Sequence, residues 1–296
     1  MDIGIIGLGK MGSNIARNLS EKGFNVIGYD RHAEHEDIVQ SSTLEHLVSQ
    51  LSLPRKLWVM VPAGKPTQRV VEELLELLEP GDIIVDAGNS HFEDSVSNYD
   101  LCKSKGISFL DCGTSGGTEG ALLGACFMVG GDVESFNTLK PYFKSASIEN
   151  GYSYVGPSGS GHYLKMIHNG IEYGMMQSIA EGFNILESSK YDFNYADVSK
   201  VWSHGSIISG YLMSTMMSIF EKDINLESLS RIVDSSGEGK WTLMEALKLG
   251  VATPVISASM NVRNQSSDKN DIQNQLLSLM RNEFGGHKLR RKEDTE

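Results

Sequence analysis

Near its N-terminus the chain reads Ile3-Gly-Ile-Ile6-Gly7-Leu8-Gly9-Lys10-Met11-Gly12, an apolar run followed by three closely spaced glycines. Met11, Ile15 and Leu19 then recur at a helical spacing that Gly23 would end. Between a strand and a helix, such glycines permit a tight turn, let a pyrophosphate approach the backbone and let helix and strand pack. We interpret residues 7–12 as a dinucleotide-binding turn; a tight turn in an α/β fold without a ligand is the alternative.

An acid and a base follow this turn at the end of the next apolar run, where Asp30 is followed directly by Arg31. A carboxylate at this position can bind the ribose hydroxyls of a dinucleotide and would repel the 2′-phosphate of NADP. Arg31 could accommodate that phosphate instead, or stack on the adenine. The sequence therefore favours NAD as the cofactor and leaves NADP as an alternative.

The first half of the chain alternates short apolar runs with helical patterns. The expected strands are Ile3–Ile6, Phe24–Tyr29, Leu57–Val61, Ile83–Asp86, Ser108–Asp111 and Phe127–Val129. Alternation of this kind favours a parallel sheet with helices on both faces. The predicted fold class is α/β, with an N-terminal doubly wound sheet of the Rossmann type over residues 1–156.

The second half, residues 157–296, reads as an all-α domain because the strand signals end near Gly156. The sequence predicts helices over 161–188, 197–219, 226–233, 240–249, 254–264 and 271–283. The last nine residues are almost all charged or polar, which is typical of a chain end that frays.

Composition excludes several classes of protein. The chain has 296 residues, 26 basic and 38 acidic, for a net charge of −12, so its charge does not favour nucleic acid or an anionic membrane. Its apolar runs are too short to span a bilayer, its three cysteines form no CxxC pair, and no signal-type N-terminus is evident. No motif with metal-ligand spacing is present. We expect a cytoplasmic protein without a metal centre.

Two further turns and one loop follow predicted strands. Residues Val61, Pro62 and Ala63 follow one strand, and Asn89 follows the next. Ligands bind at the carboxyl ends of strands in open α/β sheets, although ordinary turns fit these positions equally well. The glycine-rich loop that contains Ser115, Gly116 and Gly117 could hold a carboxylate through its N–H groups, or could be only a flexible connection.

A polar stripe marks the long helix predicted after residue 160. Lys165, His168, Asn169 and Glu172 have the spacing i, i+3, i+4 and i+7 and so share one helix face. A lysine and a glutamate two turns apart can act as base and acid on a small substrate, although a solvated helix face is the more common reason for such a pattern.

Several motifs, in order along nearly the whole chain, match one family. They are residues 7–12, 88–90, 115–117, 159–177 and 237–242, Arg263, and the segment from Arg281 to His287. On these motifs the chain resembles 6-phosphogluconate dehydrogenase (decarboxylating) in its short form. The stretch Gly161-His-Tyr-Leu-Lys165-Met-Ile-His-Asn-Gly-Ile-Glu172-Tyr is the most specific of them.

The resemblance implies a mechanism. Lys165 would accept the proton of the substrate's 3-hydroxyl and, once protonated, stabilise the enolate that forms on loss of CO2. Glu172 would then protonate C1 to give ribulose 5-phosphate. The resemblance also assigns substrate contacts to the following residues: Asn89, Ser115, Gly116, Gly117, His168 and Asn169 for the sugar acid, and Tyr173 and Arg263 for its phosphate.

The same resemblance implies a partner subunit, because Arg281 and His287 match a motif that reaches a neighbouring active site in the family. We therefore expect a homodimer or tetramer. One departure concerns the phosphate site: the chain has Ser236 where longer enzymes have a lysine, and Glu238 in place of a threonine. Another β-hydroxyacid dehydrogenase, acting on 3-hydroxyisobutyrate for example, is the alternative function.

Overall fold

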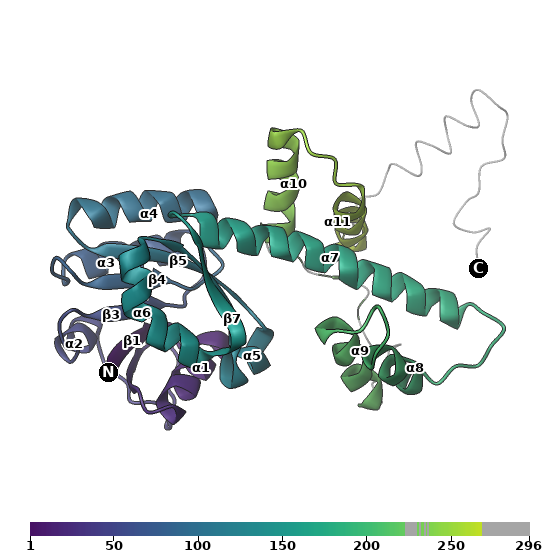
Figure 1. The fold of residues 1–296 in the computed structure, drawn as a ribbon, viewed down its shortest axis with the longest axis horizontal. Helices are drawn as coiled ribbons and strands as arrows, with labels where there is room; N and C mark the ends of the chain where they lie inside the picture. Colours follow the sequence, from purple (N-terminus) through teal and green to yellow (C-terminus); the bar gives the residue numbers. More distant parts are fainter. Residues whose placement is uncertain (223–229, 231, 234, 236, 268–296) are drawn as a thin grey trace, which may run out of the picture. The chain divides into compact units, whose positions relative to one another are not determined.

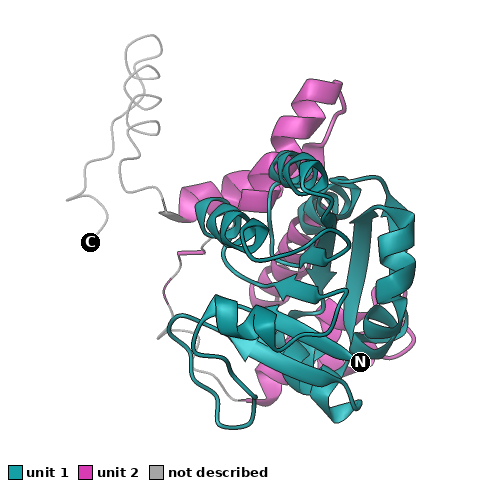
Figure 2. Cartoon of the chain, turned by 90° about the vertical axis from the view of Figure 1, so that its left-hand side faces the viewer, with its two compact units in different colours: residues 1–170 teal, residues 171–296 magenta. Residues whose placement is uncertain are grey.

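The computed structural model describes residues 1–222, 230, 232, 233, 235 and 237–267. The chain forms two compact units, Met1–Gly170 and Ile171–Glu296, which are coloured separately in Figure 2. The division falls inside one long helix, α7 (Ser160–Glu187), which begins in unit 1 and ends in unit 2. The domain boundary expected near Gly156 lies just before this helix and stays a prediction.

Unit 1 is built on one seven-stranded sheet in the order β2-β1-β3-β4-β5-β6-β7 (Figure 1). The strands are β1 (Asp2–Ile6), β2 (Asn25–Tyr29), β3 (Lys56–Val59), β4 (Ile83–Asp86), β5 (Ser108–Ser115), β6 (Ala125–Gly131) and β7 (Ser147–Gly156). All neighbouring strands are parallel except β5 and β6. The carboxyl ends of β1 to β5 therefore share one side of the sheet, which we call the carboxyl edge.

Helices cover both faces of this sheet, as the sequence predicts. The helices of unit 1 are α1 (Lys10–Glu21), α2 (Leu44–Ser49), α3 (Lys65–Leu75), α4 (Phe92–Ser104), α5 (Gly117–Leu123) and α6 (Val133–Ala146). Residues of α1, α5 and α6 join one buried apolar cluster, and residues of α2, α3 and α4 join a second. Successive residues of one strand alternate between them: Trp58 joins the first cluster, while Leu57 and Val59 join the second. The doubly wound α/β fold is confirmed.

The sheet differs from the expectation at β6 and β7. The strand β6 is antiparallel to β5 because only the short helix α5 and Gly124 connect them, whereas a parallel crossover needs about a dozen residues or more. The edge strand β7 was not among the predicted strands, because Ser147–Gly156 is largely polar. Its alternate residues Tyr152 and Tyr154 pack on the first core cluster, which explains why it pairs with the sheet.

Unit 2 contains the second part of α7 and four further described helices, α8 (Tyr195–Ser203), α9 (Tyr211–Glu221), α10 (Gly237–Leu249) and α11 (Pro254–Ser267). An aromatic cluster joins three of them: the ring of Phe183 on α7 lies 5.7 Å from the rings of Tyr195 and Trp202 and 5.2 Å from that of Phe220. The described part of this unit is helical, as the sequence predicts.

The helix expected over 197–219 is two helices in the structure. Gly205 and Gly210, between α8 and α9, have φ values of +78° and +154°, which a right-handed helix does not allow. The helix expected over 226–233 falls mainly, and that over 271–283 entirely, outside the described residues. Among the described residues, no helix is both long and apolar enough to cross a membrane.

Candidate active site

The glycine-rich turn after β1 has the geometry of a dinucleotide-binding turn. Gly7 has φ +93°, and its N–H donates to the carbonyl of Tyr29 at 2.8 Å. A Cβ on Gly12 would lie 1.9 Å from the Gly7 carbonyl oxygen, so helix and strand pack at this distance only with glycine. A Cβ on Gly9, which caps α1, would meet nothing within 4 Å. The free N-terminus of α1 and the open space beside Gly9 fit a pyrophosphate.

The other predicted residues of this turn take different places. Leu8 is buried, Met11 packs against the first core cluster, and Lys10 is exposed at the first position of α1. Lys10 is therefore the one side chain of the turn that is free to contact a ligand's charge, whereas Leu8 and Met11 contribute packing and backbone.

Asp30, directly after β2, is held as a hydrogen-bond acceptor. Its Oδ2 accepts from the N–H of Leu8 at 2.7 Å, and its Oδ1 accepts from the N–H groups of His32 and Ala33 at 2.8 and 2.9 Å. Burial alone would raise the pKa of Asp30, but these backbone bonds outweigh it and hold the pKa below its ordinary value. The carboxylate is thus charged and fixed where a ribose would bind.

Arg31 extends away from Asp30 to an acid on α3. Its Nη2 donates to both carboxylate oxygens of Glu73, at 2.7 and 3.0 Å, and this pairing raises the pKa of the guanidinium. Both side chains are about half exposed, at 50% and 47%. The arginine that could have accommodated a 2′-phosphate is therefore already paired.

The turns after β3 and β4 meet at the carboxyl edge. A Cβ on Gly88 would lie 3.0 Å from the carbonyl oxygen of Val61, so the two turns pack backbone to backbone. The hydroxyl of Thr67 on α3 donates to the carbonyl of Pro62 at 3.0 Å and so holds this turn in place. Ala63 and Asn89 are exposed next to this contact. The structure thus brings the two predicted turns together beside the glycine-rich turn of β1.

The N-terminus of α7 is anchored to β5 by a buried carboxylate. Asp111 is fully buried, and its two oxygens accept from the N–H groups of Gly159 at 2.7 Å and His162 at 2.9 Å. A Cβ on Gly161 would lie 2.5 Å from the carbonyl oxygens of Asp111 and Met128, so helix and sheet are in direct backbone contact. These bonds satisfy N–H groups that a helix start leaves unpaired.

His162 adds a second anchor between α7 and the carboxyl edge. Its Nε2 is 3.2 Å from the carbonyl oxygen of Gly88, and its Nδ1 is 2.7 Å from the hydroxyl of Ser95 on α4. A carbonyl oxygen only accepts, so Nε2 carries a proton and donates it to the carbonyl of Gly88. Sequence patterns do not indicate a role for Asp111, Ser95 or His162, because these roles depend on burial and on contacts between distant segments.

The polar stripe of α7 forms a chain of contacts that ends at the glycine-rich loop after β5. Nζ of Lys165 donates to Oδ1 of Asn169 at 2.7 Å, and the same oxygen lies 3.0 Å from Nδ1 of His168. Nε2 of His168 is 3.4 Å from the hydroxyl of Ser115. Lys165 itself is only 7% exposed. A buried amine, an amide, an imidazole and a hydroxyl are thus assembled at the carboxyl edge.

Glycines allow this assembly. A Cβ on Gly113 would lie 2.4 Å from Cβ of Lys165, so the lysine backbone approaches β5 only because residue 113 has no side chain. Gly116 and Gly117 have φ values of +111° and +63°, a backbone that other residues rarely adopt. The loop of Ser115 turns there into α5 and leaves the serine partly exposed.

The remaining described candidates lie in unit 2. Glu172 is half-buried on α7. Tyr173 is 5% exposed, and the guanidinium of Arg263 on α11 lies 3.8 Å from its ring centroid. A Cβ on Gly239 would lie 2.7 Å from the same ring, which brings α10 against it. Tyr173 and Arg263 therefore form a cation–π pair.

The departure at Glu238 is visible in the structure. Glu238, in the first turn of α10, is 2% exposed, and neither of its carboxylate oxygens has a hydrogen-bond partner among the described residues. Ser236, Arg281 and His287 lie outside the described residues.

The fold, the glycine-rich turn and the buried lysine define a dinucleotide-binding dehydrogenase as the class of protein. A family model for the NAD binding domain of 6-phosphogluconate dehydrogenase matches residues 2–156, and one for the C-terminal domain of 6-phosphogluconate dehydrogenase matches residues 161–296. The chain belongs to the 6-phosphogluconate dehydrogenase family, and the resemblance found in the sequence is confirmed.

Individual relatives and a solved structure support the same family. The chain is 47% identical to YqeC of Bacillus subtilis (strain 168), provisionally named a 6-phosphogluconate dehydrogenase, over 99% of the chain and 100% of that protein. It is 36% identical to the NAD(+)-dependent, decarboxylating 6-phosphogluconate dehydrogenase of Haloferax volcanii, over 99% and 100%. The Plasmodium falciparum 6-phosphogluconate dehydrogenase structure, solved in apo form and with NADP+ or 6-phosphogluconate, matches with a TM-score of 0.82 at 33% identity, over 99% of this chain and 66% of that one.

Proposed function

We propose that the protein oxidises and decarboxylates 6-phosphogluconate to ribulose 5-phosphate and CO2, with NAD as the preferred oxidant and NADP as the alternative. The observation that carries this proposal is the contact chain from Lys165 through Asn169 and His168 to Ser115. In this chain of contacts a buried amine lies beside an amide, an imidazole and a hydroxyl, on the same edge of the sheet as the glycine-rich turn after β1. The family and its decarboxylating NAD(+)-dependent relative support the substrate and the cofactor.

Lys165 acts as the base in this proposal. The bound nicotinamide supplies the acceptor for the hydride that leaves C3. The amine is buried and, in this proposal, accepts the proton of the 3-hydroxyl. After that transfer the lysine is an ammonium, and its charge stabilises the oxygen that becomes an enolate as CO2 leaves. Asn169 holds Nζ in place, since its Oδ1 accepts from it in the free protein.

Glu172 acts as the acid that completes the reaction. It lies seven residues after Lys165 on the continuous helix α7, so the two side chains share a face about 10 Å apart along the axis. An acid is needed only if CO2 is lost, because the enolate that remains must gain a proton at C1 to become the ketone of the product. Glu172 therefore donates its proton there, and product forms only with both residues present.

Tyr173 and Arg263 hold the phosphate of the substrate in this proposal. A guanidinium binds phosphate oxygens well, and its stacking on the Tyr173 ring fixes its direction. Asn89, Ser115, Gly116, Gly117 and His168 orient the carboxylate and hydroxyls of the sugar acid. The buried Glu238 adds no positive charge to the phosphate site, so Arg263 carries more of the binding than a site with a lysine would require.

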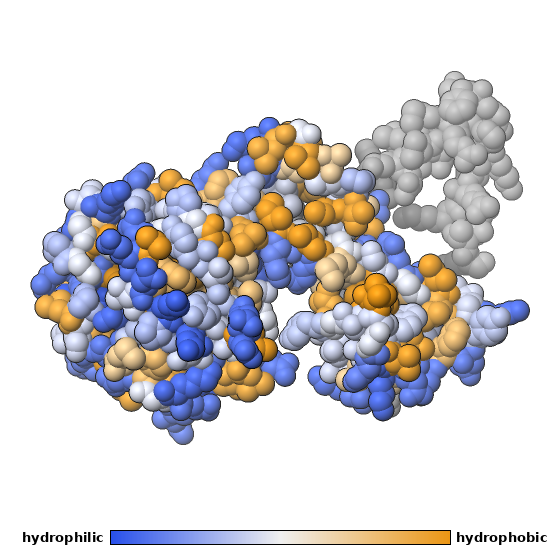
Figure 3. Space-filling view, viewed as in Figure 1, coloured by the Kyte–Doolittle hydropathy of each residue, from blue (hydrophilic) through white to orange (hydrophobic). Residues whose placement is uncertain are grey.

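A second copy of the chain completes the enzyme. Unit 2 exposes large apolar side chains on its helices and in the segment between α8 and α9, and Figure 3 shows hydrophobic surface in the region of α8 and α9. They include Ile185, Val201, Ile207, Ile208, Tyr211 and Leu247. Exposed apolar surface of this kind marks contact surfaces. Arg281 and His287 would then reach the active site of the neighbouring subunit of a homodimer or tetramer.

The test uses Glu172→Gln with Glu181→Gln as its matched control, because Glu181 is exposed on the same helix and bonds to Gln177. General acid catalysis contributes about 10²- to 10⁴-fold, so we expect such a loss in ribulose 5-phosphate formation for Glu172→Gln alone. Full activity of Glu172→Gln on a small β-hydroxyacid, without CO2 release, would contradict the proposal and favour a 3-hydroxyisobutyrate-like dehydrogenase.

A further inference from the structure

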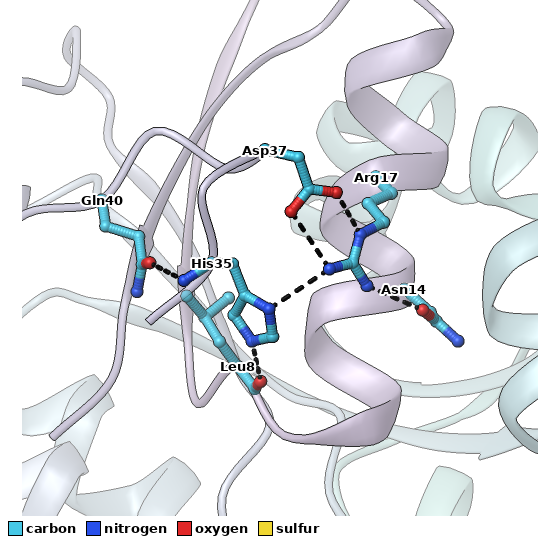
Figure 4. Close-up of polar contacts among 6 residues, drawn as sticks. All are labelled: Leu8, Asn14, Arg17, His35, Asp37 and Gln40. Carbon is cyan, nitrogen blue, oxygen red and sulfur yellow. Dashed lines mark hydrogen bonds and ion pairs between the residues drawn. The ribbon is translucent and has the colours of Figure 1, made fainter. Parts of the chain in front are cut away.

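The segment after Asp30 is tied to helix α1 by a second arginine, Arg17, which Figure 4 shows. Nε of Arg17 donates to Oδ2 of Asp37 at 2.6 Å, and its Nη2 donates to Oδ1 of Asp37 at 3.1 Å. Asn14 accepts from Nη1 at 3.0 Å. The side chain of Arg17 is 28% exposed, so this guanidinium is accessible to a ligand, but an acid already binds it on two atoms.

His35 connects this pair to the dinucleotide turn. Nη2 of Arg17 lies 3.2 Å from Nδ1 of His35, and Nε2 of His35 lies 2.8 Å from the carbonyl oxygen of Leu8 (Figure 4). The carbonyl accepts, so the proton is on Nε2 and Nδ1 accepts from the arginine. The N–H of Leu8 donates in turn to Asp30. Arg17 is therefore linked through one side chain and one peptide residue to the carboxylate that would bind the ribose.

Arg31 thus follows Asp30 directly, Arg17 is connected to it through His35 and Leu8, and each arginine is paired with its own acid. Arg31 is bound by Glu73 on α3 through two contacts, and Arg17 is bound by Asp37 through two contacts. A 2′-phosphate brings about two negative charges and needs a cation to offset both them and Asp30. With both guanidiniums paired, the group formed by Asp30, Arg17, Arg31, Asp37 and Glu73 has a net charge of −1.

We propose that Asp37 and Glu73 determine the cofactor preference of this protein by keeping Arg17 and Arg31 from the 2′-phosphate of NADP. Asp30 repels that phosphate directly, and the two further acids act through the arginines that they hold. NAD, which has ribose hydroxyls in place of the phosphate, needs neither cation. The inference concerns only the dinucleotide site, so it does not depend on the identity of the sugar acid.

The two ion pairs are partly exposed, so we expect them to weaken the binding of NADP without preventing it. Solvent and salt weaken each pair, and a phosphate competes with the acid for the same guanidinium. Asp37→Asn and Glu73→Gln each free one arginine while leaving the local shape. We expect each to tighten NADPH binding about 3- to 10-fold and to leave NADH binding within about 2-fold.

The experiment titrates the full chain with NADH and with NADPH, following nicotinamide fluorescence without any sugar acid. The variants are Asp37→Asn, Glu73→Gln, the double variant, and the control Glu72→Gln, whose side chain is exposed on the same helix and accepts from Gln68. A gain for NADPH alone, larger in the double variant and absent in the control, supports the proposal. The gain should disappear when Arg17→Met is added to Asp37→Asn.

Two results would overturn the proposal. An unchanged ratio of NADPH to NADH affinity in the double variant would mean that the acids do not withhold the arginines. An equal loss of both affinities would mean that the pairs only support the fold of the segment after Asp30. Because the readout is binding of the dinucleotide alone, neither result depends on whether 6-phosphogluconate is the substrate.

Discussion

The two ends of the carboxyl edge of unit 1 hold their functional groups by different means. At the α7 end, Asp111 and Lys165 are buried, and the glycine at position 113 lets helix and sheet meet without a side chain between them. At the β2 end, Arg31 and Glu73 are about half exposed and form a pair on the surface. Packing geometry therefore fixes the functional groups at the α7 end, whereas charge balance determines the arrangement at the β2 end. Substitutions at the two ends should differ in the size of their effects and in the dependence of those effects on salt.

The largest effect is expected from Lys165→Met at the buried end. In the proposed mechanism this amine accepts the substrate's proton, so kcat should fall about 10²- to 10⁴-fold without it. Turnover is measured by the absorbance of the reduced nicotinamide, and NADH affinity by fluorescence. Lys140→Met, which removes an exposed lysine of α6, is the control and should leave turnover unchanged. Substantial turnover in Lys165→Met would show that another group is the base.

Gly113→Ala should come next, since it tests the contact between β5 and α7. The new Cβ would lie 2.4 Å from Cβ of Lys165, so the helix must shift. A shift of about 1 Å can cost on the order of 10²-fold in kcat, and overpacking costs about 1–3 kcal/mol of unfolding free energy.

Gly182→Ala on α7 is the matched control for this substitution. A Cβ at position 182 would meet nothing within 4 Å, so alanine should stabilise the helix by about 0.5–1 kcal/mol. Urea unfolding measures both changes. Equal stability of the two variants would contradict the close contact at Gly113.

Asp111→Asn removes the charge that anchors the start of α7. An amide can accept at only one of the two N–H groups that the carboxylate satisfies, so we expect a loss of about 1.5–3 kcal/mol in unfolding free energy. The activity should also fall. We expect the fold decrease in kcat to exceed the fold change in KM, because the start of the helix positions Lys165. Asp100→Asn, an exposed aspartate of α4, should change neither quantity.

The smallest effect on stability is expected at the other end of the edge. Glu73→Gln breaks an exposed pair, which is worth at most about 1 kcal/mol, and the difference from the unmodified protein should shrink at high salt. Thermal unfolding at low and high ionic strength measures it. A loss as large as that of Asp111→Asn would show that the contrast between the two ends is not real.

The sequence predicted most of the fold because its signals are local. The run from Ile3 to Gly12 and the alternating strands and helices indicate the doubly wound sheet without further information. The sequence does not indicate the strand β7 because its ten residues are largely polar, and its packing on the apolar core through Tyr152 and Tyr154 appears only in the fold. The break between α8 and α9 depends on glycine conformations that apolar periodicity does not reveal.

Site residues could be predicted from the sequence where they lie close together in one motif. They could not be predicted where the contact joins segments that are distant in sequence. Lys165 and Asn169 lie one turn apart, so their spacing alone suggested a shared face. Asp111 and His162 are 51 residues apart in sequence, and Arg31 and Glu73 are 42 apart, so only the fold brings each pair together. From the sequence alone Arg31 could accommodate a 2′-phosphate or stack on adenine, whereas in the structure Glu73 on α3 binds its guanidinium.

The proposed oxidative decarboxylation is tested most directly by measuring both of its products in one reaction. Purified protein is mixed with 6-phosphogluconate and NAD, and in a parallel reaction with NADP, while reduced nicotinamide and released CO2 are measured together. The proposed function requires equal amounts of reduced cofactor and CO2, formed faster with NAD. Reduced cofactor without CO2, or no turnover with either cofactor, would contradict it.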